Sequence, residues 1–446
     1  MNTPIVDFVR SYADKNISRC HMPGHKGRDI LGFEKYDITE ISGADVLSGA
    51  DGIIKKSEDN ASLLFDSAHT FYSTQGSTVA IYAMIALLKK DAFHRPRILA
   101  ARNAHRAFVQ GCAHADARVD WIFPGEANSI ISFGVTPEQV ERAISESADG
   151  YDALYLTSPD YLGFIQDIGA IADVCRKYDV PLLVDNAHGA YLKFLPESLH
   201  PLDLGATLCC DSAHKTLPAL TGGAYLHVSK NAPRRFLSLA RDAMTLFSST
   251  SPSYLTLQSL DMCNLYMSDG FPEKLSGCIC HVEKLKSYIS SLGFDVVKSE
   301  PLKVVVDASS VGISGDKLSD ILRNDGVESE FSDEDYLVLM LTAFNDEKDF
   351  EKIEKAFSKV EIRGKRQKPC FALKNIESVM SLRDAVFSPC EIVKVRESLG
   401  RICAMPTVNC PPAVPIAVCG EVITEEMIRI FEYYHINSVK VLNETI

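Results

Sequence analysis

The chain has 446 residues, of which 46% are hydrophobic and 24% charged, a composition typical of a globular protein with a sizeable core and two or three domains. Its net charge of −13 disfavours partners such as nucleic acid or an anionic membrane surface. The amino terminus does not resemble a signal peptide, and the longest apolar run, 79–88, is too short to span a bilayer. Thirteen cysteines without a CxxC pair indicate reduced thiols, so we expect a cytoplasmic protein without a metal site.

The hydrophobic pattern predicts alternating helices and strands over the first two thirds of the chain. An amphipathic helix is expected over 5–14 and a helix that is apolar on every side over 79–88. Alternation of this kind is typical of a parallel sheet with helices on both faces. Strands are expected over 97–102, 119–123, 153–159, 181–185, 207–210 and 222–229, with further helices over 136–148, over 168–178 and from Tyr254.

Beyond about residue 290 the pattern changes to short strands, over 303–307 and 336–342, between charged helices such as 347–359. This change predicts a second, smaller α+β domain. Within it, the proline-rich segment 408–415 indicates rigid extended backbone rather than helix. We therefore expect an amino-terminal arm over 1–48, a large cofactor-binding α/β domain over 49–288 and a carboxyl-terminal α+β domain over 289–446.

Two of the predicted strands end beside groups that can do chemistry. Asp185 ends the strand 181–185, and Lys215 follows the strand 207–210. A buried carboxylate is costly unless something pairs with it, and ligands bind at the carboxyl ends of strands in such sheets. An acid and a lysine there indicate pyridoxal 5'-phosphate, in which the lysine forms the Schiff base and the acid pairs with the ring nitrogen. The alternative is an ordinary solvated lysine.

A Gly76-Ser77-Thr78 turn leads directly into the apolar helix. Free backbone N–H groups, two hydroxyls and the positive end of the helix dipole together make a phosphate site. The alternative is an ordinary Ser/Thr helix cap. A basic turn, His21-Met-Pro-Gly-His25-Lys26-Gly27, stands nearer the amino terminus, and by itself it is equally compatible with a surface turn.

The motifs resemble those of the bacterial ornithine/lysine/arginine decarboxylases, which are pyridoxal-phosphate enzymes of the aspartate-aminotransferase type of fold (fold type I). The resemblance covers nearly the whole chain and keeps the order of the motifs. The chain resembles the short members of the family, which do not have the receiver-like amino-terminal domain of the long members. It implies an α/β architecture with a large parallel-sheet domain and a smaller carboxyl-terminal α+β domain. The matching segments are His21–Gly27, Gly76-Ser77-Thr78, Arg102-Asn-Ala-His105, Asp185-Asn-Ala-His188, Ser212-Ala-His214-Lys215-Thr216, and Cys410-Pro-Pro-Ala-Val-Pro415 with Gly420-Glu421.

The resemblance also implies roles for these residues. Lys215 would carry the cofactor, Asp185 would keep its ring nitrogen protonated, and His105 would stack on one ring face with Ala187 on the other. Thr250 and Ser251 match a turn that reaches the neighbouring subunit's phosphate, which implies a homodimer. The cofactor-binding set also includes Gly76, Ser77, Thr78, His188, Ser212 and His214.

The chain departs from the family pattern at four positions. Asp160 stands where threonine is usual, Asn186 replaces a glutamate, Cys410 a tyrosine and Ala413 a glycine. These departures concern the identity of the substrate more than the identity of the cofactor.

The function implied is decarboxylation of arginine, lysine or ornithine to the amine, for polyamine metabolism, with Lys215 or His214 returning a proton to Cα. The distal cation of such a substrate needs an acidic partner, and we expect Glu421, Glu330 or Asp160, in that order. Alternatives are transamination or elimination on the same cofactor, or a non-catalytic relative. No carboxyl-terminal arginine can be assigned to hold a substrate carboxylate, which disfavours transamination.

Overall fold

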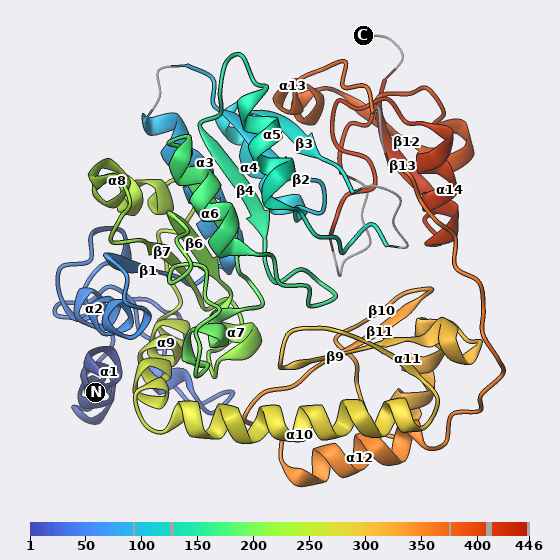
Figure 1. The fold of residues 1–446 in the computed structure, drawn as a ribbon. Helices are drawn as coiled ribbons and strands as arrows, with labels where there is room; N and C mark the ends of the chain where they lie inside the picture. Colours follow the sequence, from blue (N-terminus) through green and yellow to red (C-terminus); the bar gives the residue numbers. More distant parts are fainter. Residues whose placement is uncertain (92–93, 125–128, 374–375, 407–412, 444–446) are drawn as a thin grey trace. The chain divides into compact units, whose positions relative to one another are not determined.

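The computed structural model describes residues 1–91, 94–124, 129–373, 376–406 and 413–443 (Figure 1). The chain forms two compact units. The first comprises Met1–His94, Asp152–Tyr155 and Ile168–Pro272; the second comprises Arg95–Tyr151, Leu156–Asp167 and Glu273–Ile446. Each unit is assembled from segments that are distant in the sequence. The domain boundaries expected after residues 48 and 288 stay a prediction.

The predicted large sheet has seven strands in the order β1-β7-β6-β5-β4-β2-β3. The pairs β5–β6 and β2–β3 are parallel, as predicted, but β7 runs antiparallel to both β6 and β1. Residues 212–223 join β6 to β7, and the only helix among them is the four-residue α7 (Ala213–Thr216). The strands are β1 (His69–Ser73), β2 (Arg97–Ala101), β3 (Arg118–Ile122), β4 (Ala153–Thr157), β5 (Leu182–Asp185), β6 (Leu208–Asp211) and β7 (Ala224–Val228).

The helices of the first unit are α1 (Pro4–Asp14), α2 (Ile53–Phe65), α3 (Ser77–Asp91), α6 (Ile168–Lys177), α7 (Ala213–Thr216), α8 (Arg234–Thr245) and α9 (Tyr254–Met267). The fully apolar helix is confirmed as α3, which lies against β6, β7 and α8. Its Ala80, Met84 and Leu87 are buried, as expected for a helix without a polar face. The neighbouring strand β1 and the helix α2 were not predicted.

The second unit contains the predicted short strands as an antiparallel sheet of order β10-β11-β9-β8. Two helices, α10 and α12, run along this sheet (Figure 1) and meet through His281 and Phe350, whose ring centroids are 5.3 Å apart. The elements are β8 (Asp295–Val297), β9 (Lys303–Asp307), β10 (Phe331–Ser332), β11 (Tyr336–Met340), α10 (Phe271–Ser291), α11 (Gly315–Asn324) and α12 (Glu347–Phe357).

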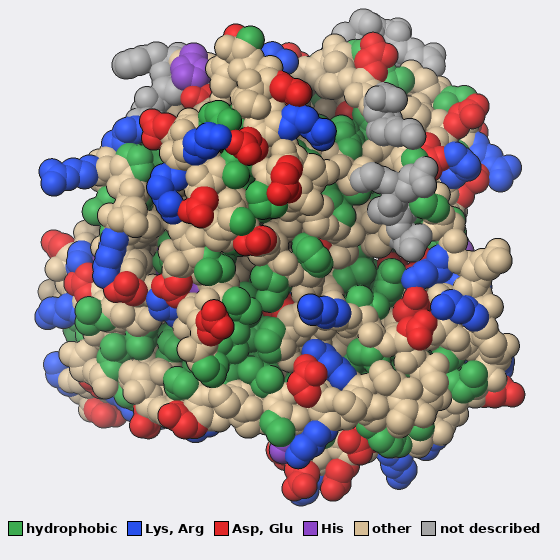
Figure 2. Space-filling model, in the orientation of Figure 1, with side chains coloured by type: hydrophobic (Ala, Val, Ile, Leu, Met, Phe, Trp, Pro, Cys, Tyr) green, Lys and Arg blue, Asp and Glu red, His purple; other side chains and the backbone are tan. Residues whose placement is uncertain are grey.

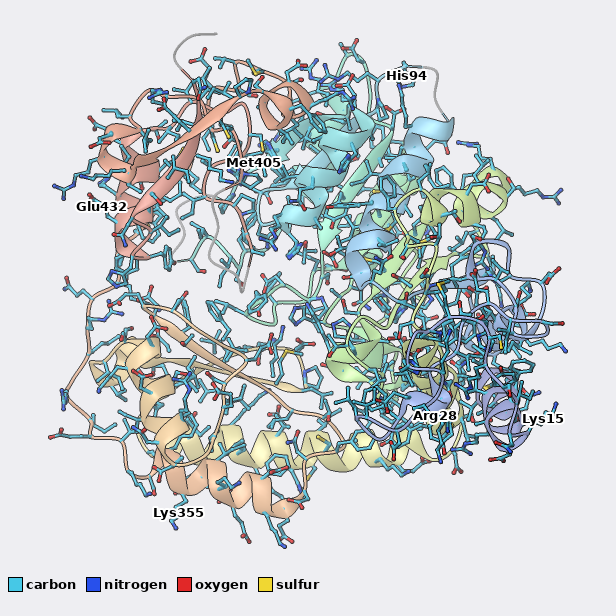
Figure 3. All side chains as sticks on the ribbon, turned by 180° about the vertical axis from the view of Figure 1, so that it is seen from behind. Lys15, Arg28, His94, Lys355, Met405 and Glu432 are labelled. Atoms are coloured by element: carbon cyan, nitrogen blue, oxygen red, sulfur yellow. The ribbon has the colours of Figure 1, made fainter. Side chains whose placement is uncertain are left out.

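Two further groups of elements belong to the second unit. The helix α5 begins with a capping box: Gln139 N donates to Thr136 Oγ1 at 3.2 Å, and Thr136 N donates to Gln139 Oε1 at 2.9 Å. The carboxyl-terminal helix α14 exposes Glu432 (Figure 3), which pairs with Arg396 at 2.6 Å. The elements are α4 (Arg106–Ala115), α5 (Pro137–Ser145), α13 (Leu382–Phe387), α14 (Glu425–Tyr433), β12 (Cys390–Lys394) and β13 (Ser438–Leu442).

Acidic and basic side chains are intermingled on the face in Figure 2, without a patch of one sign. Within the described ranges, none of the helices is both long enough and apolar enough to cross a membrane.

Most of the proline-rich segment predicted to be extended, including Cys410, lies outside the described residues. Its end is described, and there Ala413 has φ +56°. This left-handed conformation explains why glycine is usual at that position.

Replacing Gly420 by Ala should destabilise the protein strongly. Gly420 has φ +84°, and an added Cβ would lie 2.3 Å from the carbonyl oxygen of Met380. Gly400 is the matched control, because it has φ +75° but no atom near its added Cβ. We expect about 1–2 kcal/mol from the backbone conformation at Gly400 and at least about 3 kcal/mol at Gly420. Urea denaturation measures both, and equal losses would show that the contact with Met380 is unimportant.

Candidate active site

Lys215 lies in α7, directly after β6, and its amino group contacts an imidazole. Lys215 Nζ is 3.0 Å from His188 Nε2, and His188 is buried. Since an ammonium group can only donate, Nε2 is the acceptor and the other ring nitrogen carries the proton. The predicted lysine is therefore held by a neighbour that can exchange protons with it.

Asp185 ends β5, and the register of the sheet places it opposite Cys210 of β6. Its Oδ1 accepts a hydrogen bond from Ala187 N at 3.1 Å, and its Oδ2 accepts one from Tyr155 Oη at 3.2 Å. Burial raises the pKa of Asp185, while the charge of Lys215 and these hydrogen bonds oppose the rise. A cation placed beside this buried carboxylate would be stabilised strongly.

The Gly76-Ser77 turn and the end of β6 face each other through hydroxyl groups. Ser212 Oγ donates to Ser77 Oγ at 2.8 Å, and Ser77 is the first residue of α3. Gly222 holds the turn from the other side, because Gly76 N donates to its carbonyl oxygen at 2.7 Å. Two hydroxyls at the amino-terminal end of a long buried helix form a suitable cradle for a phosphate group.

These groups fit pyridoxal 5'-phosphate. The cofactor needs an amine to anchor it, an acid for the ring nitrogen and hydroxyl or N–H donors for the phosphate. Lys215, Asp185 and the Ser77–Ser212 pair supply this set from one unit of the chain. Thr216 Oγ1 also lies buried there without a hydrogen-bond partner, a costly state that a polar ligand would relieve.

The other predicted cofactor residues lie in different surroundings. His214 is tied to the backbone, because its Nδ1 is 2.9 Å from the carbonyl oxygen of Gly223. Thr250 and Ser251 are exposed, and the adjacent Ser249 N donates to Gln75 Oε1 at 2.7 Å, which brings this turn close to Gly76. His105 belongs to the second unit, where its Nδ1 accepts from Ala107 N at 3.1 Å and caps α4.

A buried network around Asp211, at the end of β6, was missed in the sequence. His200, Cys209 and Asp211 bring potential metal-ligand atoms within 4.8 Å of one another, yet the carboxylate is already surrounded by donors. His200 Nε2 lies 3.0 Å away, His227 Nε2 3.1 Å, Cys209 Sγ 3.7 Å and Asn186 Nδ2 2.7 Å. The network explains one departure from the family pattern, because a glutamate at position 186 would place a second carboxylate beside Asp211.

Tyr155, the hydrogen-bond donor to Asp185, was also missed. It lies within the apolar strand β4, where the sequence pattern suggests only that a tyrosine packs in the hydrophobic core. Only the pairing of strands, which brings residue 155 beside residue 185, gives its hydroxyl a role.

The three candidate acids for the substrate's distal cation differ in how they are engaged. Glu421 is buried and pairs with Arg102, with 3.1 Å between Oε2 and Nη2. Glu330 is exposed, and its Oε1 accepts a hydrogen bond from Tyr161 Oη at 2.9 Å. Of these two, only Glu330 offers an accessible carboxylate.

Asp160, the third candidate, is 1% exposed. Its Oδ1 accepts from Leu162 N at 3.1 Å and from Phe164 N at 3.0 Å, whereas its Oδ2 is buried without a hydrogen-bond partner. Burial raises the pKa of Asp160 to about 7, although interactions with Ser132 and the backbone oppose the rise. Its carboxyl group therefore titrates near neutral pH.

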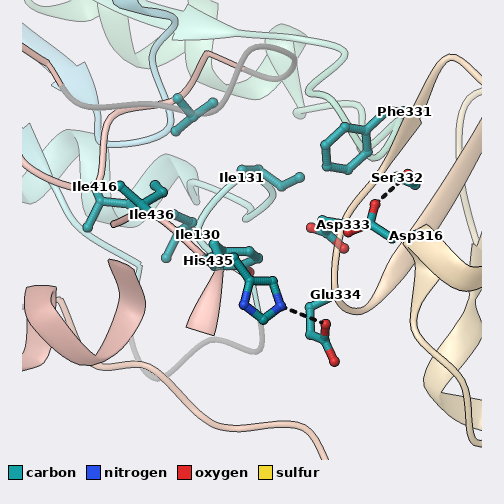
Figure 4. Close-up of a pocket in the computed structure, with 12 residues that line it drawn as sticks. Ile130, Ile131, Asp316, Phe331, Ser332, Asp333, Glu334, Ile416, His435 and Ile436 are labelled. Atoms are coloured by element: carbon teal, nitrogen blue, oxygen red, sulfur yellow. Dashed lines mark hydrogen bonds and ion pairs between the residues drawn. The ribbon is translucent and has the colours of Figure 1, made fainter. Parts of the chain in front are cut away.

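A pocket lies along β10, lined by its residues Phe331 and Ser332 (Figure 4), whereas Glu330 lines a different pocket. Phe331 lines it and also meets Tyr161, with 5.2 Å between ring centroids. Burial raises the pKa of Asp333 in the pocket wall to about 7. The described lining residues are Ile130, Ile131, Asp316, Phe331, Ser332, Asp333, Glu334, Val414, Ile416, Tyr434, His435 and Ile436. The pocket thus combines apolar walls with carboxyl groups.

Comparisons with known proteins agree with this geometry. A family model described as Orn/Lys/Arg decarboxylase, major domain, matches residues 3–300. An arginine decarboxylase of Halalkalibacterium halodurans is 30% identical over 461 residues, which cover 95% of this chain and 91% of that protein. An arginine decarboxylase of Bacillus subtilis is 27% identical, over 96% of this chain and 92% of that protein.

Solved structures extend the likeness to the fold. A lysine decarboxylase of Francisella novicida matches with a TM-score of 0.79 and 17% identity, over 99% of this chain and 81% of that one. The constitutive lysine decarboxylase of Escherichia coli matches with a TM-score of 0.78 and 16% identity, over 99% and 82% of the respective chains. These matches confirm the predicted α/β fold.

The raised pKa of Asp160 predicts how Asp160→Asn affects stability at different pH values. The unfolded carboxyl loses its proton near its ordinary value of 3.8, whereas the folded one keeps it up to about pH 7. Stability contributed by the protonated carboxyl is therefore lost as the pH rises from about 4 to 7. The asparagine variant should gain stability relative to wild type over that range, by up to a few kcal/mol, at about 1.4 kcal/mol per pKa unit.

Urea midpoints at pH 4.5 and pH 8 measure this difference. Asp149→Asn is the control, because the side chain of Asp149 is 80% exposed and should show no such trend. A difference between Asp160→Asn and wild type that is the same at both pH values would contradict the raised pKa.

Proposed function

Because this chain belongs to the Orn/Lys/Arg decarboxylase family, we propose that it uses pyridoxal 5'-phosphate to decarboxylate arginine, lysine or ornithine. The product would be the corresponding amine, for polyamine metabolism. The observation that carries the proposal is the juxtaposition of Lys215, His188 and the buried Asp185 at adjacent strand ends, with the Ser77–Ser212 pair beside them.

When bound, the cofactor supplies the sink for the electrons of the broken bond between Cα and the carboxyl group. Lys215 would anchor it, and Asp185 would hold a proton on its ring nitrogen. The burial of Asp185 suits that task, since a buried carboxylate gains most from a cationic partner. Tyr155 and Ala187 orient the carboxylate by donating to its two oxygens.

The return of a proton to Cα can be assigned to Lys215, with His188 as its proton-exchanging neighbour. The two side chains are 3.0 Å apart, whereas one ring nitrogen of His214 is occupied by the carbonyl oxygen of Gly223. This geometry favours Lys215 over His214 as the group that donates to Cα. His214 would help to hold the phosphate, with its ring fixed by the contact between Nδ1 and the carbonyl oxygen of Gly223.

Gly76, Ser77, Thr78 and Ser212 would hold the phosphate. Thr250 and Ser251 would complete a neighbouring subunit's phosphate site, and their exposure is compatible with contact across a subunit boundary. His105 would stack on the cofactor ring, opposite Ala187. We therefore propose a cytoplasmic homodimer whose active sites use residues from both subunits.

The distal cation of the substrate would pair with Glu330. Its carboxylate is accessible and held by Tyr161, and Glu330 lines a pocket with Leu339 and Leu341, whose apolar side chains suit an aliphatic substrate. Asp160 is the next candidate, because its buried Oδ2 has no hydrogen-bond partner. Glu421 becomes the last, because Arg102 already neutralises it.

Replacing Lys215 by Ala should remove the covalent attachment of the cofactor. Wild-type protein loaded with pyridoxal 5'-phosphate should show a visible absorption band, and borohydride should fix the cofactor to the peptide that contains Lys215. The variant should lose or shift the band. Lys230→Ala is the control, since Lys230 is an exposed lysine paired with Asp66. Fixation of the cofactor to another lysine in wild-type protein would overturn the assignment.

Replacing Glu330 by Gln should weaken use of the basic amino acids. An unpaired distal cation should lower kcat/KM by at least about tenfold, or 1.4 kcal/mol, mainly through KM. The cofactor absorbance should stay unchanged. Carbon dioxide release from arginine, lysine and ornithine measures this effect, with Glu328→Gln as the control because Glu328 pairs with Arg323 at 3.0 Å. Unchanged kcat/KM in Glu330→Gln would transfer the role to Asp160, and release from none of the three amino acids would refute the substrate class.

A further inference from the structure

Arg102 is a buried residue of the second unit, and both of its terminal nitrogens donate hydrogen bonds. It follows β2 and is 2% exposed. Its Nη1 donates to the carbonyl oxygen of Pro415 at 2.8 Å, and its Nη2 donates to that of Ile416 at 3.0 Å. The guanidinium group also lies over the ring of Trp121, 5.3 Å from its centroid. One side chain thus binds the backbone of a segment more than 300 residues further along the chain.

Glu421 completes this arrangement from the same distant segment. Its Oε2 accepts from Arg102 Nη2 at 3.1 Å and from Val418 N at 2.7 Å. The carboxylate therefore closes its own turn and neutralises the arginine at once. An arginine in this position needs such a partner, because an uncompensated buried charge is strongly unfavourable.

A further contact joins the same two segments beside His105. Arg106 N donates to the carbonyl oxygen of Ala413 at 2.8 Å. The turn 102–106 is therefore bound to the segment 413–421 on both sides of His105. If Glu421 lost its charge and its hydrogen bonds, Arg102 would be buried without its anion, and its hold on this turn would be weakened.

We propose that Glu421 is a positioning residue: through Arg102 it holds the turn that carries His105, and it does not bind the distal cation of the substrate. The inference rests on the proposed decarboxylase function, in which His105 contacts the cofactor. A substrate cation at Glu421 would have to displace Arg102, leaving a buried guanidinium group without its anion.

The first test compares two glutamine variants. A glutamine in place of Glu421 would keep an acceptor oxygen for Arg102 and Val418, so Glu421→Gln should leave KM for arginine, lysine and ornithine within about twofold of wild type. Glu330→Gln should raise it by about tenfold or more. A tenfold rise in KM for Glu421→Gln, with unchanged kcat, would overturn the positioning role.

The second test is a double-mutant cycle with Arg102→Met, Glu421→Met and the combined variant. Each single change leaves one buried charge unpaired, so each should lower kcat by about tenfold or more, and their effects should not add. The combined variant should be no worse than the poorer single variant, because both charges are gone. Additive losses would overturn the proposal.

Visible circular dichroism of the cofactor-loaded proteins gives a readout that general destabilisation does not move. The single methionine variants should alter the cofactor band, and Glu432→Gln, which breaks only the exposed pair with Arg396, should not. If the single variants fail to fold, Arg102→Lys is the substitute. It keeps the charge but cannot donate to both the Pro415 and the Ile416 carbonyl oxygens through a guanidinium group, so it should change the same band. An unchanged band in every folded Arg102 variant would refute the proposal, whereas inactivity of wild-type protein on all three amino acids would refute only the decarboxylase function.

Discussion

The buried carboxylate of Asp185 sets the conditions for the rest of the candidate site. An anion enclosed at the end of a strand must be surrounded by donors or cations. Tyr155, the backbone of residue 187 and the charge of Lys215 meet that need in part. The burial that makes Asp185 costly also makes it effective, because a positive ring nitrogen beside it would be held far more firmly than in water.

Other buried carboxylates of the chain are also surrounded by hydrogen-bond donors, some from neighbouring residues and some from distant segments. Asp211 is surrounded by two imidazoles, an amide and a thiol, and Glu421 by a guanidinium group and a backbone N–H. Asp160 has donors for only one oxygen, and its pKa is accordingly raised to about 7. Burial also raises the pKa of Glu421 despite the charge of Arg102, whereas the two imidazoles beside Asp211 outweigh burial and lower the pKa of that acid.

The departures from the family pattern can be read in the same physical terms. Asn186 avoids a second anion beside Asp211 and donates to it instead. Ala413 occupies a left-handed conformation that glycine adopts without strain. Asp160 introduces an acid after β4 that the fold does not fully satisfy. The first two departures have a local structural account, and the third leaves a titrating group directly before Tyr161, the hydrogen-bond donor to Glu330.

The sequence by itself determined the elements with a strong local signal. The apolar helix α3, the capping box of α5 and the strands ending near Asp185 and Lys215 depend on periodicity and on neighbouring residues, which are visible in one dimension. The motifs near these elements were also sufficient to identify the family and to predict the fold. The strand β1 was missed because its polar and aromatic residues, though all buried, gave no alternating pattern.

Only the tertiary structure decided which of these groups meet. The antiparallel course of β7, the approach of Tyr155 to Asp185 and the pairing of Arg102 with Glu421, 319 positions apart, depend on strand order and chain return rather than on local pattern. Glu421 shows the consequence. Its place in a family-like motif suggested a substrate contact, but its partner is an arginine that no spacing in the sequence connects to it. The chemistry of each residue can be read from the sequence, whereas the partner that neutralises a buried charge depends on how the chain folds.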